Sequence, residues 1–563
     1  MPLLEQIKKL PKLLFVILSF TFLLNFYLAT RDSQTIDEGA HLAAGYSYVT
    51  TKDFRLNPEH PSFFKLLAGT AIIPLNTKPA EQLDGWNDGN QWPAGKDLIY
   101  NSSSSARQIL LFARLPSIII TVLLVYAVFL LARRLAGEKI GLFAAGLFAL
   151  DPTLNGHGHL ITNDVLLALG AIVFLLGALN YWSSPNKKHL LLFALATLLV
   201  VSAKFSGLLL LPIAVVIVIL KNRRHTKRLL KHLGVAALIV FFGIWLQYGF
   251  KIQNFNQDLS TTPADDPLVA KAASFKQNHL GAAWIFDVPV PAYPYVRGLA
   301  TLVLHNSEGH PSYLYGNRDR HRKILYFPIA IATKLPVVII AATSTALLFI
   351  ILKRFRKEKE LRKNFIILLS FAGIFVATAM AGQINIGVRH VFAAWPFIYI
   401  TAAIVLYSLF QNLRKNRSIF IIMFAVLLLP VLIASLRLPI AYQNELGSSM
   451  EQFGNKPVLI DSNRDWAQDL YRLNDYLNDG GVTEFGEGLF SNVVLDDVFA
   501  GKNFCTLEYY EPICRDKVEP PCLLAISDTV MWLEPTEYYK WVKETYDLTD
   551  RVGGSISIYS CRN

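Results

Sequence analysis

Charged residues and cysteines are scarce in this sequence, and two kinds of motif are missing. Only 17% of the 563 residues are charged and 53% are hydrophobic, which is too apolar for a series of soluble domains. No convincing nucleotide-binding motif is present. No internal repeat is found either, which disfavours a transporter built from two repeated halves.

The four cysteines all lie in the last 60 residues, at Cys505, Cys514, Cys522 and Cys561. Their spacings do not match a zinc module, and an even number confined to one segment favours disulfides, with three pairings open. Disulfides would place this segment in an oxidising compartment. The alternative is four separate thiols in a cytosolic tail.

The apolar residues gather in blocks of about 20, the length that crosses the hydrocarbon core of a membrane. We therefore predict a polytopic α-helical membrane protein with eleven spans. The expected spans are 13–30, 107–133, 139–151, 160–182, 188–203, 205–221, 229–250, 324–352, 364–382, 389–410 and 417–438. The first block also resembles a signal sequence, but its apolar part is longer than a typical signal core.

Positive charge is unevenly distributed between the two sides of these spans. A net charge of +12 would suit nucleic acid binding if the charges were clustered in one patch. Instead, 24 Lys and Arg but only 4 acidic residues lie in the amino-terminal tail and the loops on its side. This asymmetry predicts a cytoplasmic amino terminus, an extracytoplasmic carboxyl terminus and a location in the inner or plasma membrane, with no nucleic acid partner.

Two outer loops, residues 31–106 and 251–323, are long enough to predict a function. Within the second loop, residues 293–305 predict an amphipathic helix on the membrane surface. We expect residues 1–440 to form the transmembrane catalytic domain and residues 441–563 a small extracytoplasmic α/β domain with disulfides.

Strands are predicted in the carboxyl-terminal segment at 457–460, 522–527 and 555–560. Trp466, Leu470, Leu473 and Leu477 repeat at helical spacing behind a capping-type start at 462–465. The segment shows no recognisable chemistry of its own.

The segment Arg31–Lys65 holds more ionisable residues than a simple linker needs. They are Asp37, Glu38, His41, Asp53, Glu59 and His60. Carboxylates can exchange protons with a substrate or bind a metal. We predict that this segment forms the floor of an active site.

Further ionisable residues are expected at the same outer face. They are Arg114, His157, His159, Asp164, Lys204, His305, Glu308, His310, Arg389 and His390. Charges at a membrane boundary are costly unless they pair with each other or with a ligand, and Arg and Lys can hold a phosphate. Taken singly, the basic residues could instead snorkel to lipid head groups, the histidines could cap a turn, and Asp164 could be a helix N-cap.

Several motifs occur in register along the chain. They are DEGAHLAAGYSYVTTKDFRLNPEHPSFFKLLAG (37–69), RLPS (114–117), SAKFSG (202–207), GHPSYLYG (309–316), YFPIAIATKLP (326–336), INIGVRHVFAAWPF (384–397) and DSNRDWAQDL (461–470). With these motifs the chain resembles the C-type (GT-C) membrane glycosyltransferases of family 39. That family includes protein O-mannosyltransferases and the lipid A aminoarabinose transferase. The resemblance covers essentially the whole chain.

The resemblance implies roles for individual residues. Asp37 takes the position of the catalytic aspartate, Glu38 completes its Asp-Glu pair, and Asp164 matches a second acidic position. The donor phosphate would be held by Arg114, Lys204, Arg389 and His390. The acceptor or loop site would include His41, Glu59, His60 and His310.

Glu59 and His310 match metal-site positions of the aminoarabinose transferase. However, His60 and Pro61 replace its Lys-Pro, so no metal is expected to be required, and a divalent metal, if bound, would use Glu59 and His310. Ser62 and the pair Leu335–Pro336 are smaller departures that concern loop geometry.

The implied reaction is transfer of a sugar from a polyprenyl-phosphate donor to a hydroxyl of a protein, lipid or envelope glycan, with inversion at the outer face. The implied partners are the lipid-linked sugar, the acceptor and the membrane. One alternative is a membrane transporter or lipid flippase. Another is an interaction protein whose spans only anchor residues 441–563.

Overall fold

The computed structural model describes residues 11–261, 266–352, 358–412, 417–507, 522–533 and 539–562. The chain forms two compact units. Unit 1 comprises Met1–Ile36, Thr121–Leu160 and Gly309–Asn563, and unit 2 comprises Asp37–Ile120 and Ile161–Glu308. Both units combine segments far apart in the sequence, and the boundary predicted at residue 440 stays a prediction.

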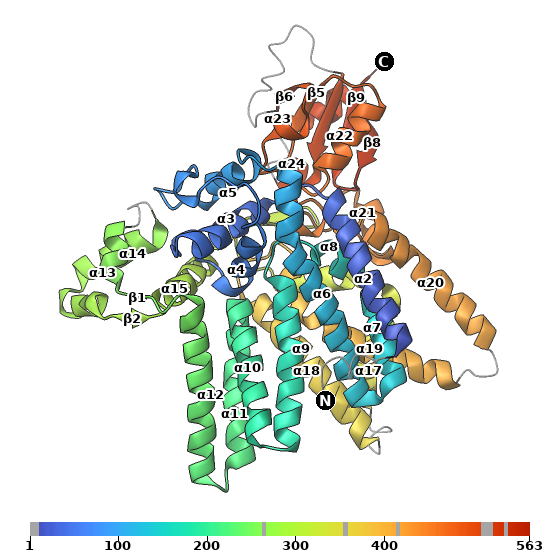
Figure 1. Cartoon of the computed structure of the whole chain (residues 1–563). Helices are drawn as coiled ribbons and strands as arrows, with labels where there is room; N and C mark the ends of the chain where they lie inside the picture. The colour runs from blue at the N-terminus through green and yellow to red at the C-terminus, as the bar shows by residue number, and fades with distance from the viewer. Residues whose placement is uncertain are drawn as a thin grey trace. The chain divides into compact units, whose positions relative to one another are not determined.

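Unit 2 is helical and contains both long membrane helices and the shorter helices of the first outer loop. Its elements, with α6 shared between the units, are α3 (Ile36–Thr50), α4 (Ser62–Ala71), η1 (Ala80–Gln82), α5 (Gln91–Tyr100), α6 (Ala106–Ala136), α9 (Asp164–Ser183), α10 (Lys187–Ala203), η2 (Phe205–Leu209), α11 (Leu210–Asn222), α12 (Thr226–Gln247), β1 (Ile252–Gln253), α13 (Phe255–Thr261), α14 (Pro267–Asn278), η3 (Leu280–Asp287), β2 (Val290–Pro291) and α15 (Tyr293–Glu308). Within it, α10 packs against α9, α11 and α12 (Figure 1). The predicted helix at 293–305 is confirmed as α15.

Unit 1 holds the remaining helices and the carboxyl-terminal sheet (Figure 1). Its elements are α2 (Lys12–Arg31), α7 (Glu138–Ala149), α8 (Pro152–His157), β3 (Ser312–Leu314), β4 (Asn317–Asp319), α16 (Tyr326–Lys334), α17 (Val337–Ile351), α18 (Lys359–Ala381), η5 (Val388–Ala394), α19 (Trp395–Asn412), α20 (Arg417–Arg437), α21 (Glu445–Gly454), η7 (Asp461–Asn463), α22 (Leu470–Asp479), β5 (Glu484–Gly488), α23 (Leu495–Val498), β6 (Asn503–Thr506), β7 (Leu523–Ser527), α24 (Asp528–Leu533), α25 (Lys540–Thr545), β8 (Tyr546–Val552) and β9 (Ile556–Cys561).

The structure confirms a polytopic α-helical membrane protein. Among the described residues, seven helices are long and apolar enough to cross a membrane, or eight if the bent pair α16–α17 counts as one span. The other three expected spans coincide with α7, α10 and α20. Helices α7 and α10 have only 12 and 17 residues, and in α20 only the segment Leu428–Arg437 is a shorter apolar helix. The total of eleven spans therefore stays a prediction.

The span expected at 324–352 is not one straight helix. Helices α16 and α17 meet at Leu335–Pro336 with a bend of 120°. Leu335 is extended, with ψ of 138°, because a residue before proline is pushed out of the helical region. The Lys334 ammonium donates to the carbonyl oxygens of Ile440 and Tyr442, at 2.8 and 2.6 Å, which holds the end of α16.

The carboxyl-terminal segment contains a five-stranded mixed sheet of order β6-β5-β7-β9-β8. Strands β6, β5 and β7 are parallel, whereas β7-β9-β8 are antiparallel. The strands expected at 522–527 and 555–560 are confirmed as β7 and β9. The strand expected at 457–460 is absent from the described sheets, and the adjoining helix begins at Leu470 rather than near Ser462.

The late start of α22 has a physical cause. Ser462 Oγ donates to the carbonyl of Ile386 at 3.1 Å, and Asp465 accepts the backbone N–H of Thr529 at 3.0 Å. These polar side chains therefore bind distant segments of unit 1 and do not cap a local helix.

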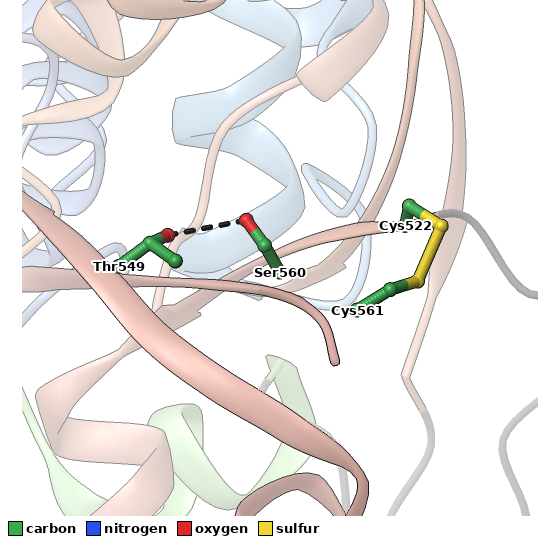
Figure 2. Close-up of a disulfide and its surroundings, with 4 residues drawn as sticks. All are labelled: Cys522, Thr549, Ser560 and Cys561. Atoms are coloured by element: carbon green, nitrogen blue, oxygen red, sulfur yellow. Dashed lines mark hydrogen bonds between the residues drawn. A yellow bond between two sulfur atoms is a disulfide. The ribbon is translucent and has the colours of Figure 1, made fainter. Parts of the chain in front are cut away.

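Disulfides are confirmed in this segment. Cys522 and Cys561 are bridged at the start of β7 and the end of β9, beside the hydrogen bond of 3.1 Å between Thr549 and Ser560 (Figure 2). Cys505 is also disulfide-bonded. Cys514 lies outside the described residues.

The helices of the first outer loop touch backbone to backbone at glycines. A Cβ added at Gly45 in α3 would lie 2.0 Å from the carbonyl oxygen of Lys65 in α4, and one at Gly69 would lie 2.2 Å from the carbonyl carbon of Gly45. On α5, a Cβ at Gly95 would lie 2.4 Å from the carbonyl carbon of Gly39. Glycine at these positions lets α4 and α5 pack directly on α3, the helix that begins with the Asp-Glu pair.

We expect Gly69→Ala to destabilise the protein by about 1–3 kcal/mol, the usual cost of overpacking, because the new methyl group meets immobile backbone atoms. Gly234→Ala is the matched control, since Gly234 is also helical and has no atom within 4 Å of its added Cβ. Thermal unfolding of the purified protein in detergent measures both variants. A Gly69→Ala midpoint equal to that of the control would contradict the close packing of α3 and α4.

Candidate active site

The Asp-Glu pair opens helix α3. Asp37 and Glu38 lie in its first turn, where the exposed N–H groups and the helix dipole stabilise carboxylates. Glu38 is fully buried, whereas Asp37 is half-buried. The two neighbouring carboxylates therefore have different environments.

The carboxylate of Glu38 is held by Arg114 of α6. Arg114 Nε donates to Glu38 Oε1 at 2.9 Å, and Nη2 donates to Oε2 at 2.6 Å. The backbone N–H of Ile161 donates to the same Oε1 at 3.0 Å. Because neither side chain is exposed beyond 1%, this is a buried bidentate ion pair of the kind that sets geometry. The structure thus brings together two predicted site residues, Glu38 and Arg114, and pairs them with each other.

A second buried pair joins the start of α9 to the end of α10. Lys204 Nζ donates to Asp164 Oδ1 at 2.7 Å. Lys204 lies directly after α10 in extended backbone, and Asn163 Nδ2 donates to the carbonyl of Ala203 at 2.6 Å. Asp164 is in the first turn of α9, so the alternative of an N-cap role for Asp164 is wrong.

Three of the predicted acceptor-site residues lie in α3 or in the loop after it, with His41 in α3 and with Glu59 and His60 in the loop between α3 and α4. The rings of His41 and His60 stack with centroids 5.4 Å apart. The fully buried Lys65 donates to the carbonyl oxygens of Asn57 and His60. Burial lowers the pKa of Lys65 to about 7, and the nearby Glu59 partly offsets this effect. Lys65 therefore holds the loop between α3 and α4 in place through these two hydrogen bonds.

Glu59 lines a cavity of about 450 Å³ within unit 2. Arg55, His305 and Glu308 line the same cavity, together with Arg297. Arg297 is held by two carboxylates, with Nε 2.8 Å from Asp258 Oδ2 and Nη2 3.0 Å from Asp266 Oδ2. This volume falls in the range of small-molecule sites, about 300–1,000 Å³.

The predicted donor-site residues Arg389 and His390 belong to unit 1. They lie in η5, where Arg389 is buried and His390 is half-buried. The guanidinium of Arg389 lies 4.2 Å from the ring centroid of Trp466, and its Nε donates to Ser462 Oγ at 3.2 Å. His310, also in unit 1, has Nδ1 3.0 Å from the carbonyl oxygen of Pro311.

His157, the last residue of α8, and His159, two residues further on, make structural contacts within unit 1. His159 Nε2 lies 2.9 Å from Asp32 Oδ2, and Arg472 binds the other oxygen of Asp32 at 2.7 Å. His157 packs edge-on against Trp466. The side chain of Asp151 is the N-cap of α8. At the other end, His159 Nδ1 lies 3.1 Å from the carbonyl oxygen of Asn155 in the last turn of α8, so the expected turn-capping role holds for His159.

The two residues suggested for a metal lie in different units, Glu59 in unit 2 and His310 in unit 1. Within the described ranges, no three or more His, Cys, Asp or Glu side chains form a metal-binding group. Metal dependence stays a prediction, and the chemistry below uses only residues of the chain.

Sequence reasoning missed two buried lysines that organise these segments, Lys65 and Lys334. Both have a visible signal, because each is a single cation inside an apolar helix, in SFFKLLAG and FPIAIATKLP. Arg297 has the same signal in α15.

The comparison with protein-family models agrees with the motifs. The family model described as dolichyl-phosphate-mannose-protein mannosyltransferase matches residues 109–246, the segment that contains Arg114, Asp164 and Lys204. This match confirms the resemblance to the family 39 glycosyltransferases over that segment. A search of curated proteins found no match.

Solved structures with a similar chain course include an oligosaccharyltransferase of Archaeoglobus fulgidus in complex with Zn and sulfate, at 13% identity, 87% of this chain, 62% of that chain and TM-score 0.43. AglB from the same organism, in complex with an inhibitory peptide and a dolichol-phosphate, is 11% identical, and the match covers 98% of this chain and 74% of that chain with a TM-score of 0.44. ArnT from Cupriavidus metallidurans bound to undecaprenyl phosphate is 12% identical, and the match covers 97% of both chains with a TM-score of 0.32. The chain thus spans less than two thirds of the first of these proteins.

Proposed function

We propose that this chain is a membrane glycosyltransferase that moves a sugar from a polyprenyl-phosphate donor to an acceptor hydroxyl at the extracytoplasmic face, with inversion. The observation that carries the proposal is that Asp37 and Glu38, neighbours at the start of α3, have different surroundings. Arg114 and the N–H of Ile161 donate three hydrogen bonds to Glu38, while the adjacent Asp37 is half-buried. Glu38 fixes the helix, and Asp37 exchanges the proton.

In the proposed reaction, Asp37 takes the proton of the acceptor hydroxyl as a general base. The acceptor oxygen forms a bond to the anomeric carbon on the face opposite the phosphate. The bond between that carbon and the phosphate oxygen breaks, and the lipid phosphate leaves with the electron pair. One displacement with this geometry inverts the anomeric configuration.

Lys204 is the proposed phosphate ligand from unit 2. One of its three N–H groups binds Asp164, and the others can stabilise the negative charge that grows on the departing phosphate. Asp164 acts through Lys204 by holding the ammonium in place. The donor roles of Arg389 and His390 rest on the family resemblance alone, and Arg114 is engaged by Glu38.

The function is tested with membranes that contain the chain and a polyprenyl-phosphate-linked radiolabelled sugar. We expect the label to move to a hydroxyl of an envelope protein, lipid or glycan, and NMR of the product to show an inverted anomeric configuration. Membranes without the chain are the control. Transfer from a nucleotide sugar only, or appearance of the intact labelled lipid in the opposite leaflet without transfer, would contradict the proposal, and the second outcome would indicate a flippase.

We expect Lys204→Gln to raise the KM for the lipid-linked donor by about 10–100-fold, the effect of losing a hydrogen bond from a charged donor. Glutamine keeps a donor for Asp164, so the buried carboxylate remains hydrogen-bonded. Lys96→Gln is the control, because Lys96 is exposed on α5. Steady-state kinetics with varied donor and varied acceptor measure the effect, and an equal rise of the acceptor KM would indicate a structural role for Lys204.

A further inference from the structure

A basic cavity lies in an acidic part of the chain. Residues 441–563 contain 21 Asp and Glu but only 10 Lys and Arg, a net charge of −11. A cavity of about 500 Å³ in this segment is nevertheless lined by five of the ten basic residues and by three of the acidic ones. The basic residues are Lys456, Arg464, Lys543, Arg551 and Arg562. The cations of this segment are therefore concentrated at one place.

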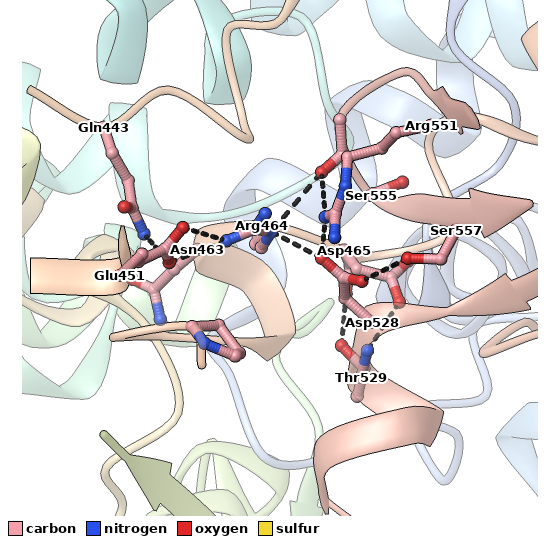
Figure 3. A network of polar contacts seen from close by, with 12 residues as sticks. Gln443, Glu451, Asn463, Arg464, Asp465, Asp528, Thr529, Arg551, Ser555 and Ser557 are labelled. Atoms are coloured by element: carbon pink, nitrogen blue, oxygen red, sulfur yellow. Dashed lines mark hydrogen bonds and ion pairs between the residues drawn. The ribbon is translucent and has the colours of Figure 1, made fainter. Parts of the chain in front are cut away.

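The three arginines form salt bridges with the carboxylates that line the cavity. Arg464 binds Glu451 Oε1 at 2.7 Å and Asp528 Oδ2 at 2.6 Å, and Arg551 also binds Asp528 (Figure 3). Arg562 Nε lies 3.0 Å from Asp547 Oδ1. The acidic lining residues are thus neutralised by arginine.

The two lysines have aromatic partners instead. Lys456 Nζ lies 4.7 Å from the ring centroid of Tyr315, and Lys543 Nζ lies 4.2 Å from that of Trp532. In the part of the chain that the structure describes, neither ammonium forms a salt bridge. Burial lowers the pKa of Lys543, the positive charge of Arg318 adds to this effect, and the negative charge of Asp528 partly offsets it. Two ammonium groups therefore supply the excess positive charge of the cavity.

The other lining groups indicate what kind of anion would fit. Gln452, Asn455 and Ser557 provide amide and hydroxyl groups, and Tyr546 and Tyr559 provide apolar ring surface. A few polar groups placed among aromatic walls are typical of sites for discrete small molecules, and about 500 Å³ is ample for a sugar ring with its substituents. Binding to an anionic lipid surface would instead need basic residues spread along an exposed segment.

We propose that this cavity binds an anionic saccharide, with Lys456 and Lys543 contacting its carboxylate or phosphate group. The inference goes beyond the proposed function and does not depend on it, because binding is measured without sugar transfer.

The test uses the full chain in nanodiscs of zwitterionic lipid. Isothermal titration calorimetry compares a tetrasaccharide that contains glucuronate, a neutral maltotetraose and inorganic phosphate. We expect the glucuronate tetrasaccharide to bind at least about tenfold more tightly than either other probe, a difference of about 1.4 kcal/mol. Its affinity should fall as salt is raised to about 0.5 M, because salt screens charge pairs.

The double variant Lys456→Gln/Lys543→Gln should lose at least about tenfold in affinity for the glucuronate tetrasaccharide. Lys540→Gln is the matched control, because Lys540 lies one turn before Lys543 on α25, is exposed and does not line the cavity. Thermal unfolding verifies that the variants fold, and the salt dependence of the native chain tests the charge without any substitution.

Four results would overturn the inference. Equal binding of the neutral and anionic tetrasaccharides would remove the role of charge, and phosphate binding as tight as the saccharide would indicate a simple anion site. Unchanged affinity in the folded double variant would remove the two lysines. Lysine-dependent binding to vesicles of phosphatidylglycerol, without binding of the tetrasaccharide, would assign the cavity to lipid head groups.

Discussion

Asp37→Asn is expected to lower sugar transfer by about 10²–10⁴-fold, which corresponds to about 2.7–5.4 kcal/mol in activation free energy. Asparagine has nearly the same shape as aspartate but cannot accept the proton of the acceptor hydroxyl. Asp37 is half-buried, and the ion pair between the neighbouring Glu38 and Arg114 does not involve it. The substitution should therefore leave the fold intact. The measurement is kcat for transfer from the lipid-linked sugar, with the donor KM little changed.

Asp84→Asn is the matched control, since Asp84 is an exposed carboxylate of the same outer loop. The amounts of folded protein are equalised from thermal unfolding before the rates are compared. Full turnover by the folded variant would remove Asp37 from the mechanism.

Arg114→Met is expected to destabilise the protein by about 3–5 kcal/mol, because it leaves the carboxylate of Glu38 buried without its charge partner. The desolvation cost of Glu38 is then no longer offset by the two hydrogen bonds from the guanidinium. The measurement is the thermal unfolding midpoint in detergent, together with the yield of folded protein.

Glu38→Gln/Arg114→Met should recover much of this loss, since no unpaired charge remains in the buried site. Arg107→Met is the control on the same helix, because Arg107 is exposed. If Arg114→Met and Arg107→Met unfold at the same temperature, the buried pair does not stabilise unit 2. If the double variant is as unstable as the single one, the cost comes from packing and not from the unpaired buried charge of Glu38.

Local patterns were sufficient to predict most of the long helices and two of the strands. Apolar blocks coincide with α2, α6, α9 and α12, and the short apolar segments at 522–527 and 555–560 predicted β7 and β9. The strand expected at 457–460 failed because four apolar residues in a row do not say whether a neighbouring strand is present to pair with them. The bend at Pro336 had a sequence signal that the hydropathy of the whole block concealed.

The candidate site was predicted as a set of residues but not as a set of contacts. The Asp-Glu pair, Asp164 and Lys204 could be named because of their motifs and because charges are rare beside apolar spans. Their partners could not, since Glu38 and Arg114 are 76 residues apart, and Asp164 and Lys204 are 40 apart. Nothing in the local sequence indicates that Arg114 binds a carboxylate of α3.

The sequence by itself determined that this chain crosses a membrane many times and that its cysteines lie in one segment. These properties follow from composition and spacing, which act over a few turns of chain. The tertiary structure decided which charges neutralise each other, which glycines let helices touch, and which lysines carry excess charge. Burial and ion pairing depend on atoms brought together from distant segments, so the local sequence pattern does not predict which residues pair or become buried.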